Sequence, residues 1–92
     1  MIEINTLVSI VTPAGEFVGK LQSQSSSYVT LKEPKMIVHA EDKQMGFARG
    51  VCLTGQENPE SVTFYSGGII LMTPSNSEIE AAYTKMTSGI II

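Results

Sequence analysis

Apolar and polar residues alternate with a strand-like period over the first part of the chain. Residues 6–12 are rich in β-branched side chains, and residues 16–24 and 28–40 place apolar residues at alternate positions over much of their length. Turn-forming residues, among them Pro13 and Gly15, separate the first two segments. Short stretches of this kind, bounded by turns, are typical of half-buried β-strands. The sequence therefore predicts three strands over residues 6–12, 16–24 and 28–40.

Two further strands are predicted over residues 47–65 and 69–73, joined by the turn Ser66-Gly67-Gly68. A short glycine-containing turn between two apolar runs is a signal for a tight β-hairpin. Gly19, within the second predicted strand, leaves room for a sharp bend. The predicted fold class is mainly β, a small, strongly bent, five-stranded barrel.

Residues 35–60 are expected to form an extended hairpin arm on this barrel. Its tip is predicted at residues 41–44, with Ala40 opposite Phe47. This register would place Phe47 on the same face as Ala40, because directly opposed residues of an antiparallel pair share a face.

The period of the pattern changes after Pro74. Ser77 followed by Glu80 matches a capping box, which predicts the start of a helix. We expect this helix over residues 77–87, with Gly89 placed to end it. The tail Ile90-Ile91-Ile92 is too apolar to stay solvated, and we expect it to dock against the barrel or a neighbouring copy. The positions with helical spacing are Ile79, Ala82, Tyr83 and Met86.

The run from Ile69 to Met72 is apolar at consecutive positions, so both faces of the strand it forms need cover. A barrel of 92 residues covers only one face. The second cover must come from the helix or from another copy of the chain. We predict a subunit interface formed by Val62, Phe64, Ile69, Ile70, Leu71 and Met72.

Length and composition indicate a single domain over residues 1–92. Six basic and nine acidic residues give a net charge of −3, which disfavours a phosphate-binding surface over the whole molecule. The single cysteine, Cys52, excludes an intrachain disulfide and a multi-cysteine zinc site. The N-terminal segment has the pattern of neither a signal peptide nor a membrane anchor, so we expect a soluble, cytoplasmic protein without a membrane partner.

Sets of residues that could act together in catalysis are mostly absent from this sequence. Cys52 and His39 are the only thiol and imidazole, and in the predicted register they lie about 13 Å apart at roughly 3.3 Å per residue. Glu41 and Asp42 sit at the predicted arm tip, where a solvated turn is the plainer interpretation than a calcium site. The sequence predicts no enzyme activity, no metal and no cofactor.

Nucleic-acid binding would need basic side chains beside aromatic ones. The candidates are Tyr28, Lys32, Lys35, Phe47 and Arg49. Each has a plainer interpretation, because an aromatic residue on a strand is usually core and an isolated lysine is usually solvated. A ring would change this balance, because each weak contact is repeated around the axis.

The order of these segments resembles the Sm-like family, small bent barrels that include Sm, LSm and Hfq proteins. The likeness in the first half is carried by Val8, Ile10, Gly15, Gly19-Lys20-Leu21, Val29, Leu31 and Glu33. In the second half it is carried by Phe64 to Ile70, although Tyr65-Ser66 stands where the family has an Arg-Gly pair. The segments TPAGEFVGKL, GFARG and VTFYSGG also resemble small Sm-like proteins of tailed phages, including cyanophages.

The resemblance implies a homo-oligomeric ring, with five to seven subunits expected. In this family the fifth strand of one subunit pairs with the fourth strand of its neighbour. The residues that form the family's uridine pocket have no counterpart in residues 23–27, and the family's N-terminal helix is missing. The leading expectation is a phage Sm-like protein that binds RNA or acts as an RNA chaperone. A protein-interaction or structural ring scaffold, perhaps associated with a virion, is the first alternative, and a small hydrolase the second.

Overall fold

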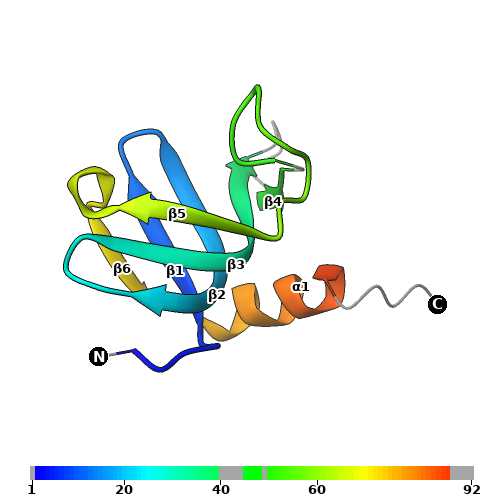
Figure 1. Cartoon of the computed structure of the whole chain (residues 1–92). Helices are drawn as coiled ribbons and strands as arrows, with labels where there is room; N and C mark the ends of the chain where they lie inside the picture. The colour runs from blue at the N-terminus through cyan, green and yellow to red at the C-terminus, as the bar shows by residue number, and fades with distance from the viewer. Residues whose placement is uncertain (1, 40–44, 49, 88–92) are drawn as a thin grey trace.

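The computed structural model describes residues 2–39, 45–48 and 50–87, and Figure 1 shows a bent sheet with one helix beside it. The predicted class, mainly β with a C-terminal helix, is confirmed. The elements in chain order are β1 (Leu7–Thr12), β2 (Gly15–Gln24), β3 (Tyr28–His39), β4 (Met45–Phe47), β5 (Ser61–Tyr65), the single 3₁₀ turn η1 (Ser66–Gly68), β6 (Leu71–Pro74) and α1 (Ser77–Thr87).

All strand pairs of the sheet are antiparallel. The strand order is β4-β3-β2-β1-β6, and β5 also pairs with β3. Residues 28–32 of β3 pair with β5, and residues 37–39 pair with β4. One edge of the long strand β3 therefore pairs first with β5 and then with β4, so the main sheet and the hairpin arm share this strand (Figure 1).

Strand β3 bends where its pairing partner changes, and Gly19 on the neighbouring strand β2 permits this bend. Glu33 has a φ of 49°, in the left-handed region, and the register between β2 and β3 shifts between Val18 and Lys20. A Cβ atom at Gly19 would lie 3.0 Å from the Leu31 Cβ and 3.1 Å from the Pro34 Cα. Glycine, which has no side chain, permits this close approach of the two strands at the position where the sequence predicts a sharp bend.

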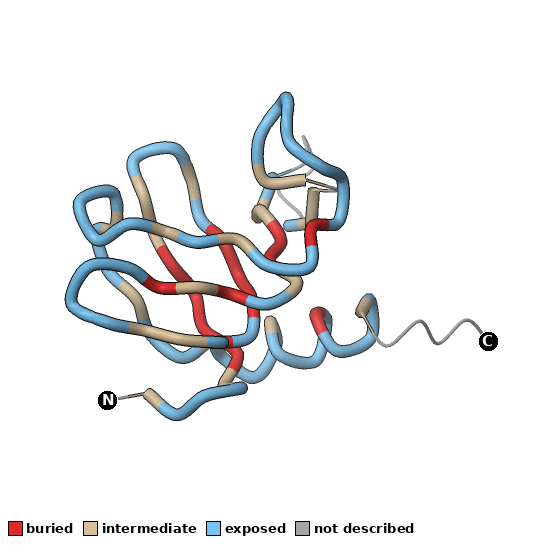
Figure 2. The backbone as a smooth tube through the Cα atoms, viewed as in Figure 1, coloured by how far each residue is buried: buried red, intermediate tan, exposed pale blue. Residues whose placement is uncertain are grey.

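The apolar interior consists of two clusters. The first fills the bent sheet and contains Val8, Ile10, Leu21, Val29 and Leu31. The second lies where α1 meets the sheet, and there Tyr83 packs with Leu7 and Val18. Figure 2 shows buried positions, in red, along the central strands and again on α1. The two clusters place one core inside the sheet and another under the helix.

Tyr83 fastens α1 to the bend in β3. Its side chain is only 1% exposed, and its hydroxyl donates a hydrogen bond of 2.7 Å to the Glu33 carbonyl oxygen. The Lys32 carbonyl oxygen lies 3.4 Å from the same hydroxyl. Burial, and to a smaller extent the charge of Glu33, raises the pKa of Tyr83 from 10.0 to about 12.

Helix α1 begins and ends at the predicted residues, but its cap differs from the prediction. The Asn76 side-chain oxygen accepts a hydrogen bond of 2.9 Å from the Ile79 amide, and the Asn76 carbonyl accepts one from the Glu80 amide. The predicted cap of Ser77 with Glu80 is therefore wrong by one residue. Asparagine is as good an N-cap as serine, so sequence alone favours neither.

The predicted strand over residues 47–65 is wrong. The structure has two short strands there, β4 and β5, and the connection between them carries only the isolated bridge between Gly50 and Glu57 among its described residues. Asn58 has a φ of 52°, which breaks an extended chain immediately before the buried Pro59.

The predicted register of the arm is also wrong. Phe47 pairs with Ile37 rather than with Ala40, which lies with the predicted tip outside the described residues. Packing decides this register, because Phe47 contacts Tyr83 of the helix with ring centroids 6.3 Å apart. In the described part of the chain no helix is long and apolar enough to cross a membrane.

Candidate functional site

Cross-strand pairs on the outer face of β3 and β5 place two tyrosines opposite each other. Val29 and Leu31 point inward, so the alternate residues of β3 point outward. Tyr28 is paired with Tyr65, and both side chains are exposed, that of Tyr65 to 70%. Directly opposed residues have Cβ atoms about 4.5–5.5 Å apart. The two tyrosines are therefore neighbours on this face, at the end of the sheet formed by β3 and β5.

Hydrogen bonds hold the neighbourhood of this tyrosine pair in place. The hydroxyls of Thr30 and Thr63, the next outward pair, lie 3.0 Å apart. The Ser66 amide donates to the Ser27 carbonyl over 2.9 Å, which joins the β2–β3 turn to η1. The Ser25 hydroxyl accepts a hydrogen bond from the Tyr28 amide. The β2–β3 turn and η1 therefore both stabilise the backbone that carries the two tyrosines.

Two lysines lie further along the same face. Lys32 is paired with Lys20 on β2, and both side chains are exposed. Like charges directly opposite each other destabilise a sheet. A bound anion would relieve that repulsion. We refer to the surface formed by Lys20, Tyr28, Thr30, Lys32, Thr63 and Tyr65 as the tyrosine–lysine face.

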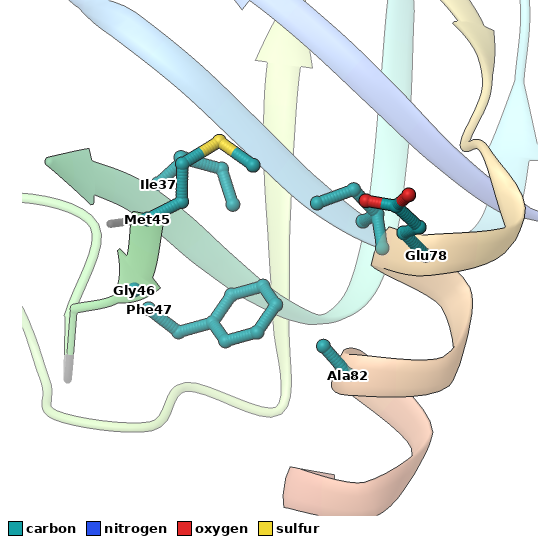
Figure 3. A pocket seen from close by; sticks show the side chains of 7 residues that line it. Ile37, Met45, Gly46, Phe47, Glu78 and Ala82 are labelled. Atoms are coloured by element: carbon teal, nitrogen blue, oxygen red, sulfur yellow. The ribbon is translucent and has the colours of Figure 1, made fainter. Parts of the chain in front are cut away.

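The five predicted RNA-binding residues do not form one cluster. Tyr28 and Lys32 lie on the tyrosine–lysine face. The Lys35 side chain is buried, and its ammonium donates a hydrogen bond of 2.8 Å to the Asn58 side-chain oxygen. Phe47 lines a groove against α1 (Figure 3), and Arg49 lies outside the described residues. The reason is the bend at Glu33, which turns the second half of β3 away from the first.

Tyr65 and Lys20 belong to this face, and the sequence prediction did not include them. Both residues are visible in the sequence as outward positions of their strands. Their place beside Tyr28 and Lys32 depends on the strand pairing, which no single segment of sequence specifies.

The six predicted interface residues divide into two groups. Val62 and Phe64 pair with the inward-facing Leu31 and Val29, and Phe64 packs against the first core cluster together with Ile69 and Met72. Ile70 and Leu71 remain exposed, to 63% and 48%. Only these two apolar side chains of the predicted set still need cover in the single chain.

An apolar recess of about 360 Å³ lies beside β5. The Phe17 and Phe64 rings, 5.1 Å apart, form part of its wall, with Ile69 next to them. It adjoins the edge of β5 that does not pair with β3. A side chain from a strand added at this edge would find apolar contacts there.

The structure brings together no residues for nucleophilic or metal chemistry within the part of the chain it describes. Cys52 is exposed on the connection between β4 and β5, whereas His39 lies in β3 and pairs with Met45. No group of three or more His, Cys, Asp or Glu residues that could hold a metal ion occurs among the described residues. Ser66-Gly67-Gly68 forms the 3₁₀ turn η1 between β5 and β6. The predicted tight β-hairpin is wrong, because β5 pairs with β3 and β6 pairs with β1 instead of with each other.

Comparison with known proteins assigns the chain to no family. No protein-family model matches it, and no curated protein sequence matches it.

Proposed function

We propose that this chain is a non-enzymatic Sm-like protein that forms a ring of five to seven copies and binds single-stranded RNA in the cytoplasm of a phage-infected cell. One observation carries this proposal. The main sheet ends at β5 on one side and at β6 on the other, and within the described residues each of these strands is paired along one edge only. In the Sm-like fold that we propose, these strands take the places of the family's fourth and fifth strands.

An open strand edge presents unpaired amide and carbonyl groups, which favour pairing with another chain. Pairing β5 of one copy with β6 of the next would consume both edges. A repeated contact between two different surfaces closes into a ring when the rotation per subunit allows it. Ile70 and Leu71 would then be covered by the neighbour, next to the recess beside β5.

RNA binding is proposed at the tyrosine–lysine face. Exposed aromatic rings stack on nucleobases, and lysines neutralise phosphates. Tyr28 and Tyr65 supply the rings, and Lys20 and Lys32 supply the charges, on one face of three adjacent strands. A ring would repeat this face in every subunit, so that weak contacts add up along one strand of RNA.

A ring scaffold that binds protein instead of RNA is the second candidate. The net charge of −3 favours it, because the protein as a whole repels polyanions. The burial of Lys35 favours it too, because this leaves fewer cations to face a phosphate backbone.

Fluorescence polarisation with labelled oligo-U and oligo-A, at low and at moderate salt, tests the RNA proposal. Loss of one stacking base costs about 1–3 kcal/mol, so we expect Tyr65→Ala to raise the Kd by roughly tenfold. Tyr65→Phe keeps the ring and is the matched control. Lys32→Gln should weaken binding and reduce its salt dependence, because one phosphate contact is lost.

Absence of binding at low salt by an intact oligomer would refute the RNA proposal and leave the scaffold. Equal affinities for Tyr65→Ala and Tyr65→Phe would exclude the tyrosine–lysine face as the binding surface.

A further inference from the structure

A groove of about 330 Å³ lies between α1 and the β3–β4 hairpin (Figure 3). Ile37 and Phe47 form its hairpin side, and Ile79 and Ala82 form its helix side. Met45 borders it and is 55% exposed. The groove is therefore apolar and adjoins the second core cluster, which would extend into it if an apolar segment filled it.

The chain itself supplies such a segment. Residues 88–92 follow α1 directly, with the sequence Ser-Gly-Ile-Ile-Ile, and lie outside the described residues. Three adjacent isoleucines leave a large apolar area in water unless something covers it. Glycine is the preferred residue for reversing a chain just after a helix ends. Gly89 stands two residues after Thr87, where such a reversal would begin.

The length of the tail matches the position of the groove. Ala82 and Thr87 are separated along the helix axis by about 7.5 Å, at 1.5 Å per residue. Three extended residues cover about 10 Å, at roughly 3.3 Å each. A tail that reverses at Gly89 would therefore bring Ile92 close to the level of Ala82.

We propose that Ile90–Ile92 fold back along α1 and occupy the groove between α1 and the β3–β4 hairpin of the same chain. The short connection favours the same chain over a neighbour, because a short link gives the tail a local concentration in the millimolar range. Glu78, the one charged lining residue, lies a turn of helix beyond Ala82. Ile92 would thus lie short of this charged side chain.

An engineered disulfide tests this proposal. In a Cys52→Ser background, Met45→Cys is combined with Ile91→Cys, and intrachain disulfide formation is followed by mass spectrometry and peptide mapping. Met45 is partly exposed, so its replacement leaves the core intact. The matched control combines Ile4→Cys with Ile91→Cys, because Ile4 is exposed to a similar 52%. Ile4 belongs to the N-terminal segment, which lies at the left of Figure 1, whereas α1 ends at the right.

We expect the intrachain disulfide to form at least about ten times faster for the Met45 pair than for the Ile4 pair. Equal rates would overturn the proposal. Disulfides between chains in place of intrachain ones would also overturn it, because the tail would then occupy the groove of a neighbour. A second variant, Ala82→Asp, places a charge at an exposed position of the groove wall and should slow the Met45 reaction while leaving the Ile4 reaction unchanged. An unchanged rate for the Met45 pair in this variant would count against the groove as the docking site.

Discussion

Replacing Tyr83 with phenylalanine isolates one hydrogen bond that ties the helix to the sheet. The Tyr83 hydroxyl donates to the Glu33 carbonyl over 2.7 Å at a site that is almost fully buried. Phenylalanine keeps the ring and its edge contact with Phe47 but removes the donor. A buried acceptor that loses its partner costs about 1–3 kcal/mol. We therefore expect Tyr83→Phe to lower the free energy of unfolding by about 1–3 kcal/mol.

Equilibrium denaturation in urea, followed by circular dichroism at one fixed protein concentration, measures this loss. The midpoint should fall while the slope stays constant, because the substitution changes stability without changing the surface exposed on unfolding. Tyr65→Phe is the control, since the Tyr65 side chain is exposed and its hydroxyl is within reach of water, and its effect should stay below about 0.5 kcal/mol. Equal stabilities of the Tyr83→Phe and Tyr65→Phe proteins would refute the assigned role of the hydroxyl.

Three further predictions concern pH, the bend and the open edge. The pKa of Tyr83 is raised from 10.0 to about 12. Its contribution to the free energy of unfolding, about 2–3 kcal/mol, is therefore fully present below pH 10 and is lost as the pH rises towards 12. Denaturation at pH 9 and pH 11.5 should show this loss in the native protein, and a loss of the same size in Tyr83→Phe would contradict the assignment to Tyr83. Gly19→Ala should destabilise by about 1–3 kcal/mol in the same urea assay, because its Cβ would press on Leu31 and Pro34. The control is Gly67→Ala, because a Cβ atom added there meets nothing within 4 Å. Equal losses of stability in the two variants would contradict the close approach at Gly19. Ile70→Lys should reduce the oligomer mass in light scattering, since edge charges oppose strand pairing, whereas Leu53→Lys, on an exposed connection, should leave it unchanged.

Local patterns in the sequence predicted the positions of the helix and of strands β1, β2, β3 and β6, but not the pairing of β5 and β6. Gly19 indicated the bend because a glycine within a strand often marks close approach of another backbone. Residues 77–87 showed the helix because apolar positions recur there at helical spacing. Each of these signals lies within a few residues of the feature it predicts.

Features that depend on contacts between distant segments were not predictable. The arm register follows from the packing of Phe47 on Tyr83, 36 positions away in the sequence. Lys35 looked like a solvated cation, but the hydrogen bond to Asn58 and the bend at Glu33 bury it. Tyr65 joined the candidate site only once its pairing with Tyr28 was known. Strand pairing and side-chain packing decide these positions, and neither has a local signature.

Pairing between β5 of one copy and β6 of another requires more than one copy, so the mass of the native protein in solution shows whether this pairing occurs. Size-exclusion chromatography with light scattering gives this mass without a shape assumption. We expect a single species of five to seven times the 9.9 kDa chain mass, stable to dilution. A species of 9.9 kDa at every concentration would contradict it, because both strand edges would then remain open in solution.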